Sequence, residues 1–151
     1  FIINSPGEFE VKDVFVYSIS ARTKGDEKTN VMENLLFRIE VEDMRLAHLG
    51  AIDRSLTDDE LSQLENIDIL MLPVGGGRVL SPKSATEVLG EIEPRIVIPM
   101  THATENVKEK LAGVEDFCKA LGACKSERMQ KYKVTRKDLP EEDMMMVILE
   151  R

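Results

Sequence analysis

The chain has 151 residues, of which 42% are hydrophobic, so it can bury a sizeable core and has the usual size of one domain. Asp and Glu outnumber Lys and Arg by 28 to 20, and the formal net charge is −8. No run of basic residues could follow a phosphate backbone, so we expect a single domain over residues 1–151 without a nucleic-acid partner.

The first part of the chain carries strand signals. From Glu8 to Ile19, β-branched and aromatic residues follow the turn at Pro6-Gly7, which predicts one or two strands. Residues Arg22 to Asn30 are polar and charged, so we expect an exposed loop there. Two apolar stretches, Leu35 to Val41 and Met44 to Leu49, flank a short acidic turn and predict a β-hairpin.

The remainder alternates helix and strand signals, which together with the early hairpins predicts an α/β fold with helices covering a sheet. A helix is expected after Thr57 as N-cap, and the apolar run Ile67 to Val74 is typical of a strand covered on both faces. Ser81 and Pro82 predict the start of a second helix. The other predicted elements are a strand at Ile96 to Met100, a helix at Val114 to Leu121, and strands at Lys131 to Thr135 and Met144 to Leu149.

Both histidines of the chain follow predicted strand ends, where ligands gather in open α/β sheets. We expect His48 and His102 within about 10 Å of each other at one sheet edge. Imidazole is a common zinc ligand, but two histidines leave a tetrahedral centre short of ligands. Taken alone, each histidine is more often a partly buried structural residue. The run Gly75 to Gly77 lacks the Lys of a P-loop and is expected to connect strand to helix with positive φ.

Three features of the sequence bear on the cellular compartment in which we expect the protein. The chain starts at Phe1 without an initiator Met or a signal peptide, so we expect it to begin within a longer protein or after processing. Cys118 and Cys124 suit neither a disulfide framework nor a zinc knuckle and are expected to be thiols in a reducing cytoplasm. The longest apolar runs are far shorter than the roughly 20 residues that cross a bilayer, so we expect a soluble protein without a membrane partner.

Five segments, read in chain order, resemble one family. They are Ser5 to Val11, His48-Leu49-Gly50, Leu56-Thr57, Ile67 to Gly76 and Pro94 to Met100. The chain is similar to the metallo-β-lactamase superfamily, in particular to small zinc-dependent hydrolases related to L-ascorbate-6-phosphate lactonase. The resemblance covers almost the whole chain. It implies an αββα sandwich lacking its N-terminal strands, of which this chain would supply the second half and part of the first.

The resemblance also implies a metal site, from which this chain departs. Family members carry an HxHxDH motif before the region of Pro6-Gly7, and nothing in this sequence matches it. Where the family reads HLGD, Ala51 replaces the Asp, and a methyl group cannot ligate a metal. Where the family reads Pro-Met-His-Tyr, Thr101 occupies the ligand position and a histidine follows. The candidate ligands of the implied zinc are therefore His48, Asp53 and His102.

These departures predict a metal-dependent hydrolase homologue that is catalytically impaired or inactive, because a lost bridging carboxylate removes the activation of the nucleophile. One alternative is an active hydrolase of an ester, lactone or phosphoester whose N-terminal metal motif lies outside this sequence. Another is a scaffold or assembly protein that uses the fold for interaction. Missing strands would leave apolar sheet surface open, so we expect a homo-oligomer or a protein partner that covers it. The residues expected at or near that interface are Phe9, Val11, Phe15 and Tyr17.

Overall fold

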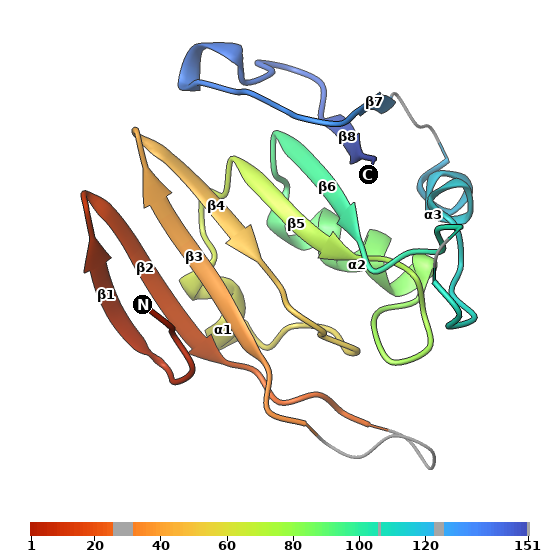
Figure 1. Cartoon of the computed structure of the whole chain (residues 1–151), viewed down its shortest axis with the longest axis horizontal. Coiled ribbons are helices and arrows are strands. Elements are labelled where there is room, and N and C mark those ends of the chain that lie inside the picture. The colour runs from red at the N-terminus through yellow and green to blue at the C-terminus, as the bar shows by residue number, and fades with distance from the viewer. Residues whose placement is uncertain (26–31, 106, 123–125, 151) are drawn as a thin grey trace.

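A computed structural model describes residues 1–25, 32–105, 107–122 and 126–150. All strands of this part belong to one eight-stranded sheet, in the order β1-β2-β3-β4-β5-β6-β8-β7, with helices on one side of it (Figure 1). The described strands therefore form one sheet and are not divided between two, as the resemblance implied. The strands are β1 Gly7–Val11, β2 Val14–Ser20, β3 Leu35–Val41, β4 Met44–His48, β5 Ile69–Pro73, β6 Ile96–Met100, β7 Ser126–Met129 and β8 Met145–Leu149; the helices are α1 Asp58–Gln63, α2 Pro82–Ile92 and α3 Val114–Leu121, with a 3-10 turn η1 at Arg136–Asp138.

The first four strands form an antiparallel meander, and the later strands pair in parallel. Both residues of the β1–β2 turn, Lys12 and Asp13, have positive φ, as do Glu42 and Asp43 between β3 and β4. Two-residue turns of this geometry match the right-handed twist of the flanking strands. The predicted hairpin at residues 35–49 is confirmed, and the predicted Glu8–Ile19 region forms two strands. Within the predicted loop Arg22–Asn30, residues 26–30 lie outside the described residues.

The helices begin where the sequence predicts. Thr57 caps α1 with a capping box that includes Glu60, and Ser81 caps α2 ahead of Pro82. Arg54 forms a two-pronged ion pair with the Glu60 carboxylate, with N–O distances of 2.8 and 2.9 Å. Burial raises the pKa of Glu60, but the hydrogen bonds from Arg54 and Thr57 outweigh it and leave that pKa below its ordinary value.

One predicted strand is wrong. Residues Lys131 to Thr135 do not pair into the sheet, and the strand in this region is β7 at Ser126–Met129. Tyr132 and Val134 alternate as the pattern suggested, but they pack against one face of the sheet instead of extending it. The alternation therefore reports one-sided packing, which a segment lying across a sheet shares with a strand.

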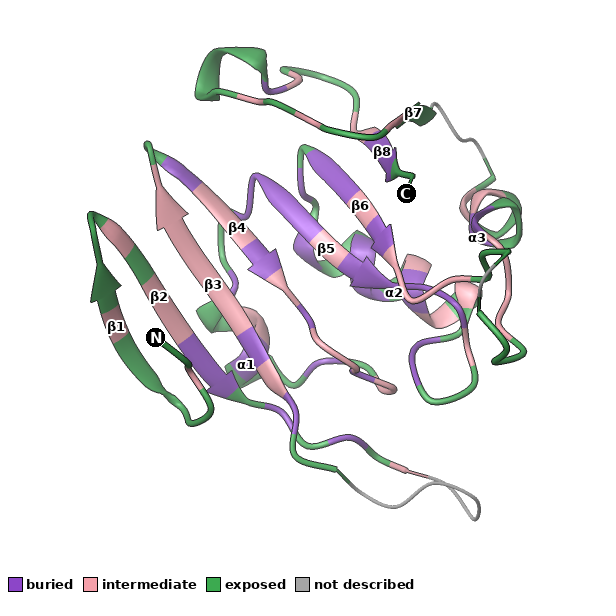
Figure 2. Cartoon of the chain, in the orientation of Figure 1, coloured by how far each residue is buried: buried purple, intermediate pink, exposed green. Residues whose placement is uncertain are grey.

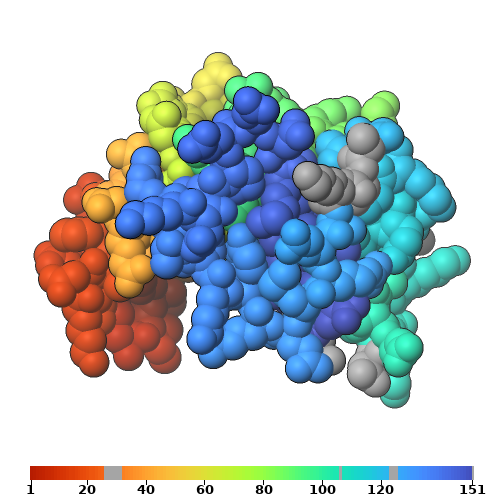
Figure 3. Space-filling view, turned by 90° about the horizontal axis from the view of Figure 1, so that it is seen from above, coloured from red at the N-terminus to blue at the C-terminus, as the bar shows by residue number. Residues whose placement is uncertain are grey.

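The two faces of the sheet are covered differently (Figure 2). On the face toward the helices, the side chains of Leu36, Ala47, Leu70 and Val97 are fully buried in the main core. On the other face, the segment between β7 and β8 covers a smaller cluster that includes Met44, Ile69, Ile96 and Val147. Beyond that segment, the second face is only half-buried, and we call it the open face. Figure 3 shows the C-terminal segment, in blue, beside the N-terminal strands, in red and orange.

Two observations bear on the expected compartment. Cys118, on α3, is disulfide-bonded, so the expectation of a free thiol is wrong for this residue; Cys124 lies outside the described residues. No helix in the described part of the chain is long and apolar enough to span a bilayer. The cytoplasmic location expected from the sequence stays a prediction.

Candidate functional site

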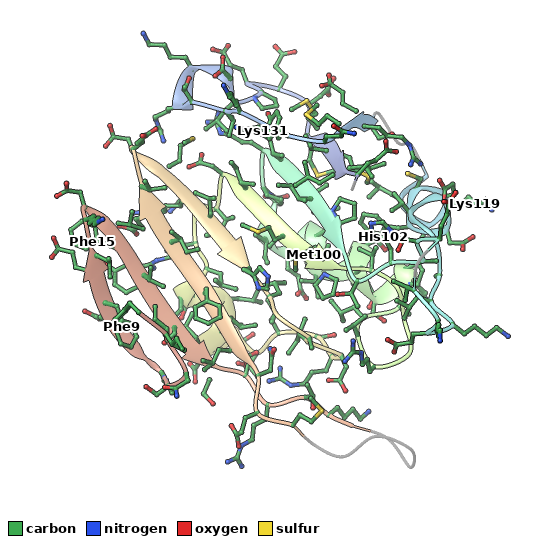
Figure 4. The ribbon with its side chains drawn as sticks, in the orientation of Figure 1. Phe9, Phe15, Met100, His102, Lys119 and Lys131 are labelled. Atoms are coloured by element: carbon green, nitrogen blue, oxygen red, sulfur yellow. The ribbon has the colours of Figure 1, made fainter. Side chains whose placement is uncertain are left out.

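The loops predicted to carry chemistry lie at one edge of the sheet. Strands β4, β5 and β6 run parallel, so the segments after their carboxyl ends share that edge. Backbone bonds join them: the N–H of Leu49 donates to the carbonyl of Met71 at 3.2 Å, and the N–H of Val74 donates to the carbonyl of Met100 at 3.0 Å. Figure 4 shows His102 just beyond Met100, at the end of β6. The histidines lie at strand ends as predicted: His48 is the last residue of β4, and His102 follows β6.

His48 is held in an orientation that suits structure better than metal binding. Its Nδ1 accepts a hydrogen bond from the N–H of Gly50 at 3.0 Å, and its ring packs edge-on against Phe37. Burial lowers the pKa of His48, which favours the neutral ring. A neutral ring that accepts at Nδ1 carries its proton on Nε2, so neither nitrogen offers a free lone pair to a cation.

His102 has the opposite arrangement. Its Nδ1 lies 3.2 Å from the carbonyl oxygen of Ala103, and because a carbonyl can only accept, Nδ1 carries the proton. Nε2 of His102 then carries the lone pair, and none of the described residues forms a hydrogen bond with it. Of the two histidines, only His102 is oriented as a zinc ligand usually is, with the second ring nitrogen donating to a backbone oxygen.

Asp53 ties the edge to a neighbouring loop. Its Oδ1 accepts from the N–H of Lys24 at 2.7 Å, and its Oδ2 accepts from the N–H of Gly25 at 2.9 Å. Both carboxylate oxygens therefore hold the start of the β2–β3 connection. A ligand role for Asp53 would compete with these two bonds.

Asn34 is a buried residue of this edge that sequence reasoning missed. Its Oδ1 accepts from the N–H of Ala51 at 2.8 Å, and its Nδ2 donates to the carbonyl of Leu49 at 3.2 Å. A Cβ on Gly50 would lie 2.2 Å from Asn34 Oδ1, so only glycine fits beneath this amide. Asn34 thus fixes the loop in which Ala51 replaces the family's carboxylate. A lone Asn before an apolar strand gave no signal of this role.

The glycine loop packs closely on the segment after β6. Gly76 and Gly77 have φ of 73° and 68°, which confirms the predicted strand-to-helix connection with positive φ. A Cβ on Gly75 would lie 2.0 Å from the carbonyl oxygen of Thr101. Thr101 itself has φ of 48°, a region that β-branched residues rarely adopt. The family's ligand position is therefore held in a constrained turn.

These residues do not assemble a metal centre. Among the residues that the structure describes, no three His, Cys, Asp or Glu side chains are grouped so that they could hold a metal ion. Strand β5 separates β4, which ends at His48, from β6, which precedes His102, a lateral distance of about 10 Å before side chains are considered. The described residues do not fit a metal pair, and the ligand roles of His48, Asp53 and His102 stay predictions.

A hollow of the described surface lies elsewhere, near the amino ends of β4, β5 and β6. At its centre, the buried Asp68 accepts from the N–H of Arg45 at 2.9 Å and has Arg95 and Arg136 each within 3.7 Å. Glu40 pairs with Arg45 at 3.3 Å. These charges satisfy one another, which explains the hollow as a structural ion-pair network.

Comparisons with known proteins give the same family as the sequence. Residues 1–101 match the family model described as a beta-lactamase superfamily domain. Over 101 residues the chain is 30% identical to a UPF0173 metal-dependent hydrolase of Archaeoglobus fulgidus, covering 65% of this chain and 43% of that protein. A UPF0173 metal-dependent hydrolase of Thermococcus onnurineus is 28% identical over 118 residues, covering 77% of this chain and 52% of that protein. The chain thus spans about half the length of these relatives, or less.

Solved structures agree on the fold. A crystal structure from Thermotoga maritima, described as a candidate zinc-dependent hydrolase of the metallo-β-lactamase superfamily, has a TM-score of 0.73 and 25% identity; the match covers 98% of this chain and 72% of that one. The metallo-β-lactamase fold protein YhfI of Bacillus subtilis has a TM-score of 0.59 at 11% identity, covering 99% of this chain and 52% of that one. The expected α/β fold of the metallo-β-lactamase type is confirmed.

Proposed function

The chain belongs to the metallo-β-lactamase superfamily, and we propose that it is a catalytically impaired homologue of that family's metal-dependent hydrolases. The observation that carries the proposal is the loop at His48 to Ala51. Ala51 has a methyl group where the family has a carboxylate. His48, the only histidine of that loop, accepts a hydrogen bond at Nδ1 from the N–H of Gly50. A two-metal hydrolase needs both ions and their bridging hydroxide in fixed geometry. This loop supplies neither a bridging carboxylate nor an available imidazole.

The second family segment supports the same proposal. Thr101 stands where the family has a histidine, and its carbonyl is packed against Gly75. His102 follows one residue later, with Nε2 free. In this proposal zinc binds weakly, through His102 with or without Asp53, and the chain behaves as a pseudoenzyme of the cytoplasm.

An active hydrolase is the rival function. The free Nε2 of His102 favours it, since one competent ligand would suffice here if polypeptide beyond the 151 residues supplied the others. Such an enzyme would cleave an ester, a lactone or a phosphoester; of these, lactone cleavage is the chemistry of the lactonase that the sequence resembles. The two functions differ in whether purified protein turns over such substrates.

The test compares the wild type with a variant that restores both family ligands, Ala51→Asp with Thr101→His. Ala120→Asp, on the exposed side of α3, is the matched control for an added carboxylate. We expect no metal-dependent hydrolysis of lactone, ester or phosphoester probes by the wild type or the control, and at least tenfold tighter zinc binding by the restored variant. Hydrolysis by the wild type that stops on chelation would contradict impairment and establish the rival function.

A further inference from the structure

A groove lies where the ends of α2 and α3 meet the segment that precedes β8, and we call it the α2 groove. Its volume is ≈ 480 Å³, within the roughly 300–1,000 Å³ that ligand sites occupy. Leu89 of α2 belongs to the main core, and Leu121 and Met144 pack against that core. All three side chains line the groove, and the last two are partly exposed. The packing of the fold therefore presents an apolar surface at this place.

Carboxylates surround this apolar surface. Four exposed acidic residues line the α2 groove, namely Glu93, Glu141, Glu142 and Asp143. The ion pairs within the described part of the chain all involve other carboxylates. Arg95, which also lines the groove, has its Nε 3.7 Å from Asp68 and donates to the carbonyl of Pro140 at 3.1 Å. Neighbouring like charges without such a partner repel one another and attract a cation.

The end of α2 adds to this negative potential. A helix C-terminus carries partial negative charge, and Lys, Arg or His in the last turn stabilises it. The last turn of α2 has no basic residue, and Glu93 is its C-cap. Glu91 lies in the same turn. The charges at this helix end thus oppose the stability of the helix, and a bound cation would reverse their effect.

Gly90 lies inside α2, although the packing of the described residues does not require a glycine there. A Cβ on Gly90 would meet nothing within 4 Å, and its φ is not positive. Glycine weakens the interior of a helix relative to alanine, but it allows another backbone to approach closely. Gly90 lines the α2 groove. Two departures from local stability, a glycine and an acidic helix end, therefore meet at one groove, as is expected where a function is located.

We propose that the α2 groove binds a basic peptide segment of another protein. An apolar side chain of that segment packs on Leu89, Leu121 and Met144, and its backbone passes over Gly90. Lys or Arg side chains on either side pair with the carboxylates of the groove. The net charge of −8 favours such a segment and disfavours an acidic one.

This binding role goes beyond the proposed function. The α2 groove lies at the amino ends of β6 and β8, whereas His48 and His102 lie at the carboxyl ends of β4 and β6. Peptide binding there is therefore independent of metal binding and of hydrolysis.

The experiment measures fluorescence anisotropy of a short labelled peptide of Lys, Leu and Ser with the full chain. One control peptide has Glu in place of Lys, and another has Ser in place of Leu. We expect a micromolar Kd for the first peptide and at least tenfold weaker binding of either control. Binding of the first peptide should also weaken as salt is added. No binding of the first peptide at micromolar concentration, or equal binding of all three, would overturn the proposal.

A first pair of variants tests the place of Gly90. Gly90→Gln fills the point where the backbone passes and meets no neighbour in the fold, so thermal unfolding should show it at least as stable as the wild type. Its peptide binding should be at least tenfold weaker. Glu87→Gln puts the same side chain on an exposed position of α2 outside the groove and should bind within about twofold of the wild type. Unchanged binding by a folded Gly90→Gln variant would contradict the proposal.

A second pair of variants tests the charges. Glu141→Gln with Glu142→Gln removes two charges of the groove, and Glu8→Gln with Glu10→Gln removes two exposed charges on β1. Only the first double variant should lose at least tenfold in binding. Equal losses would show diffuse attraction to an acidic protein and would overturn the proposal. So would peptide binding by the 151-residue chain that is lost in a longer protein containing it, because that protein's own polypeptide would then fill the groove.

Discussion

We predict that the side chain of Asn34 contributes several kcal/mol to the unfolding free energy. Replacing Asn34 with Ala removes the acceptor for the Ala51 N–H, in a part-buried hydrogen bond, and the donor to the Leu49 carbonyl, in a buried one. Each unsatisfied buried group costs about 1–3 kcal/mol, so the variant should lose about 2–4 kcal/mol of unfolding free energy. For a chain of this size that corresponds to a fall in Tm of roughly 5–15 °C.

Urea titration of three variants tests this directly. Asn34→Asp keeps the acceptor for the Ala51 N–H but places a carboxylate oxygen against the Leu49 carbonyl, so this variant should also be clearly destabilised. Asn4→Ala, at an exposed position, should change stability by less than about 0.5 kcal/mol. Amide exchange of Ala51 should also accelerate in Asn34→Ala. An Asn34→Ala variant as stable as Asn4→Ala would refute the claim that this amide holds the loop.

Two further predictions concern other contacts. Gly75→Ala forces a Cβ against the Thr101 carbonyl and should lower the unfolding free energy by about 1–3 kcal/mol. A Cβ on Gly90 in α2 meets nothing within 4 Å, so Gly90→Ala should raise the unfolding free energy by up to about 1 kcal/mol. Calorimetry of both variants tests this difference. The pKa of Glu60 is lowered on folding, so the ionised Glu60 carboxylate stabilises the folded chain above its ordinary pKa of 4.5, and this stabilisation is lost as the pH falls through the lowered value. Arg54→Ala should therefore weaken the dependence of the unfolding free energy on pH in acid. An unchanged pH dependence would show that the Arg54–Glu60 pair contributes nothing.

The sequence predicted the individual helices and turns better than the way the segments pack in layers. Capping residues and turn pairs are local signals, and Thr57, Ser81 and Pro82 start their helices where expected. The failure at residues 131–135 has a physical cause, since Tyr132 and Val134 pack on the sheet with the same alternation that a strand would show. Which face a side chain joins depends on register, and the sequence pattern did not separate Phe9 from Phe15, which lie on opposite faces of the sheet.

The site was predictable in place but not in chemistry. The strand ends located His48 and His102 at one edge because parallel strands share their carboxyl ends. The hydrogen bonds that decide which ring nitrogen is free come from the turn at Gly50 and the backbone at Ala103, and no spacing rule encodes them. Asn34 was invisible for the same reason, since its partners lie 15 and 17 residues away in sequence.

The central claim is that this chain keeps the family's scaffold without its metal-holding set of side chains. Its most direct test is the zinc content of purified wild-type chain, measured by elemental analysis after saturation with zinc and exhaustive dialysis. The arrangement of His48, Asp53 and His102 predicts retention far below one ion per chain. One or more tightly held zinc ions per chain, lost together with folding stability when His102 is replaced by Ala, would contradict the claim.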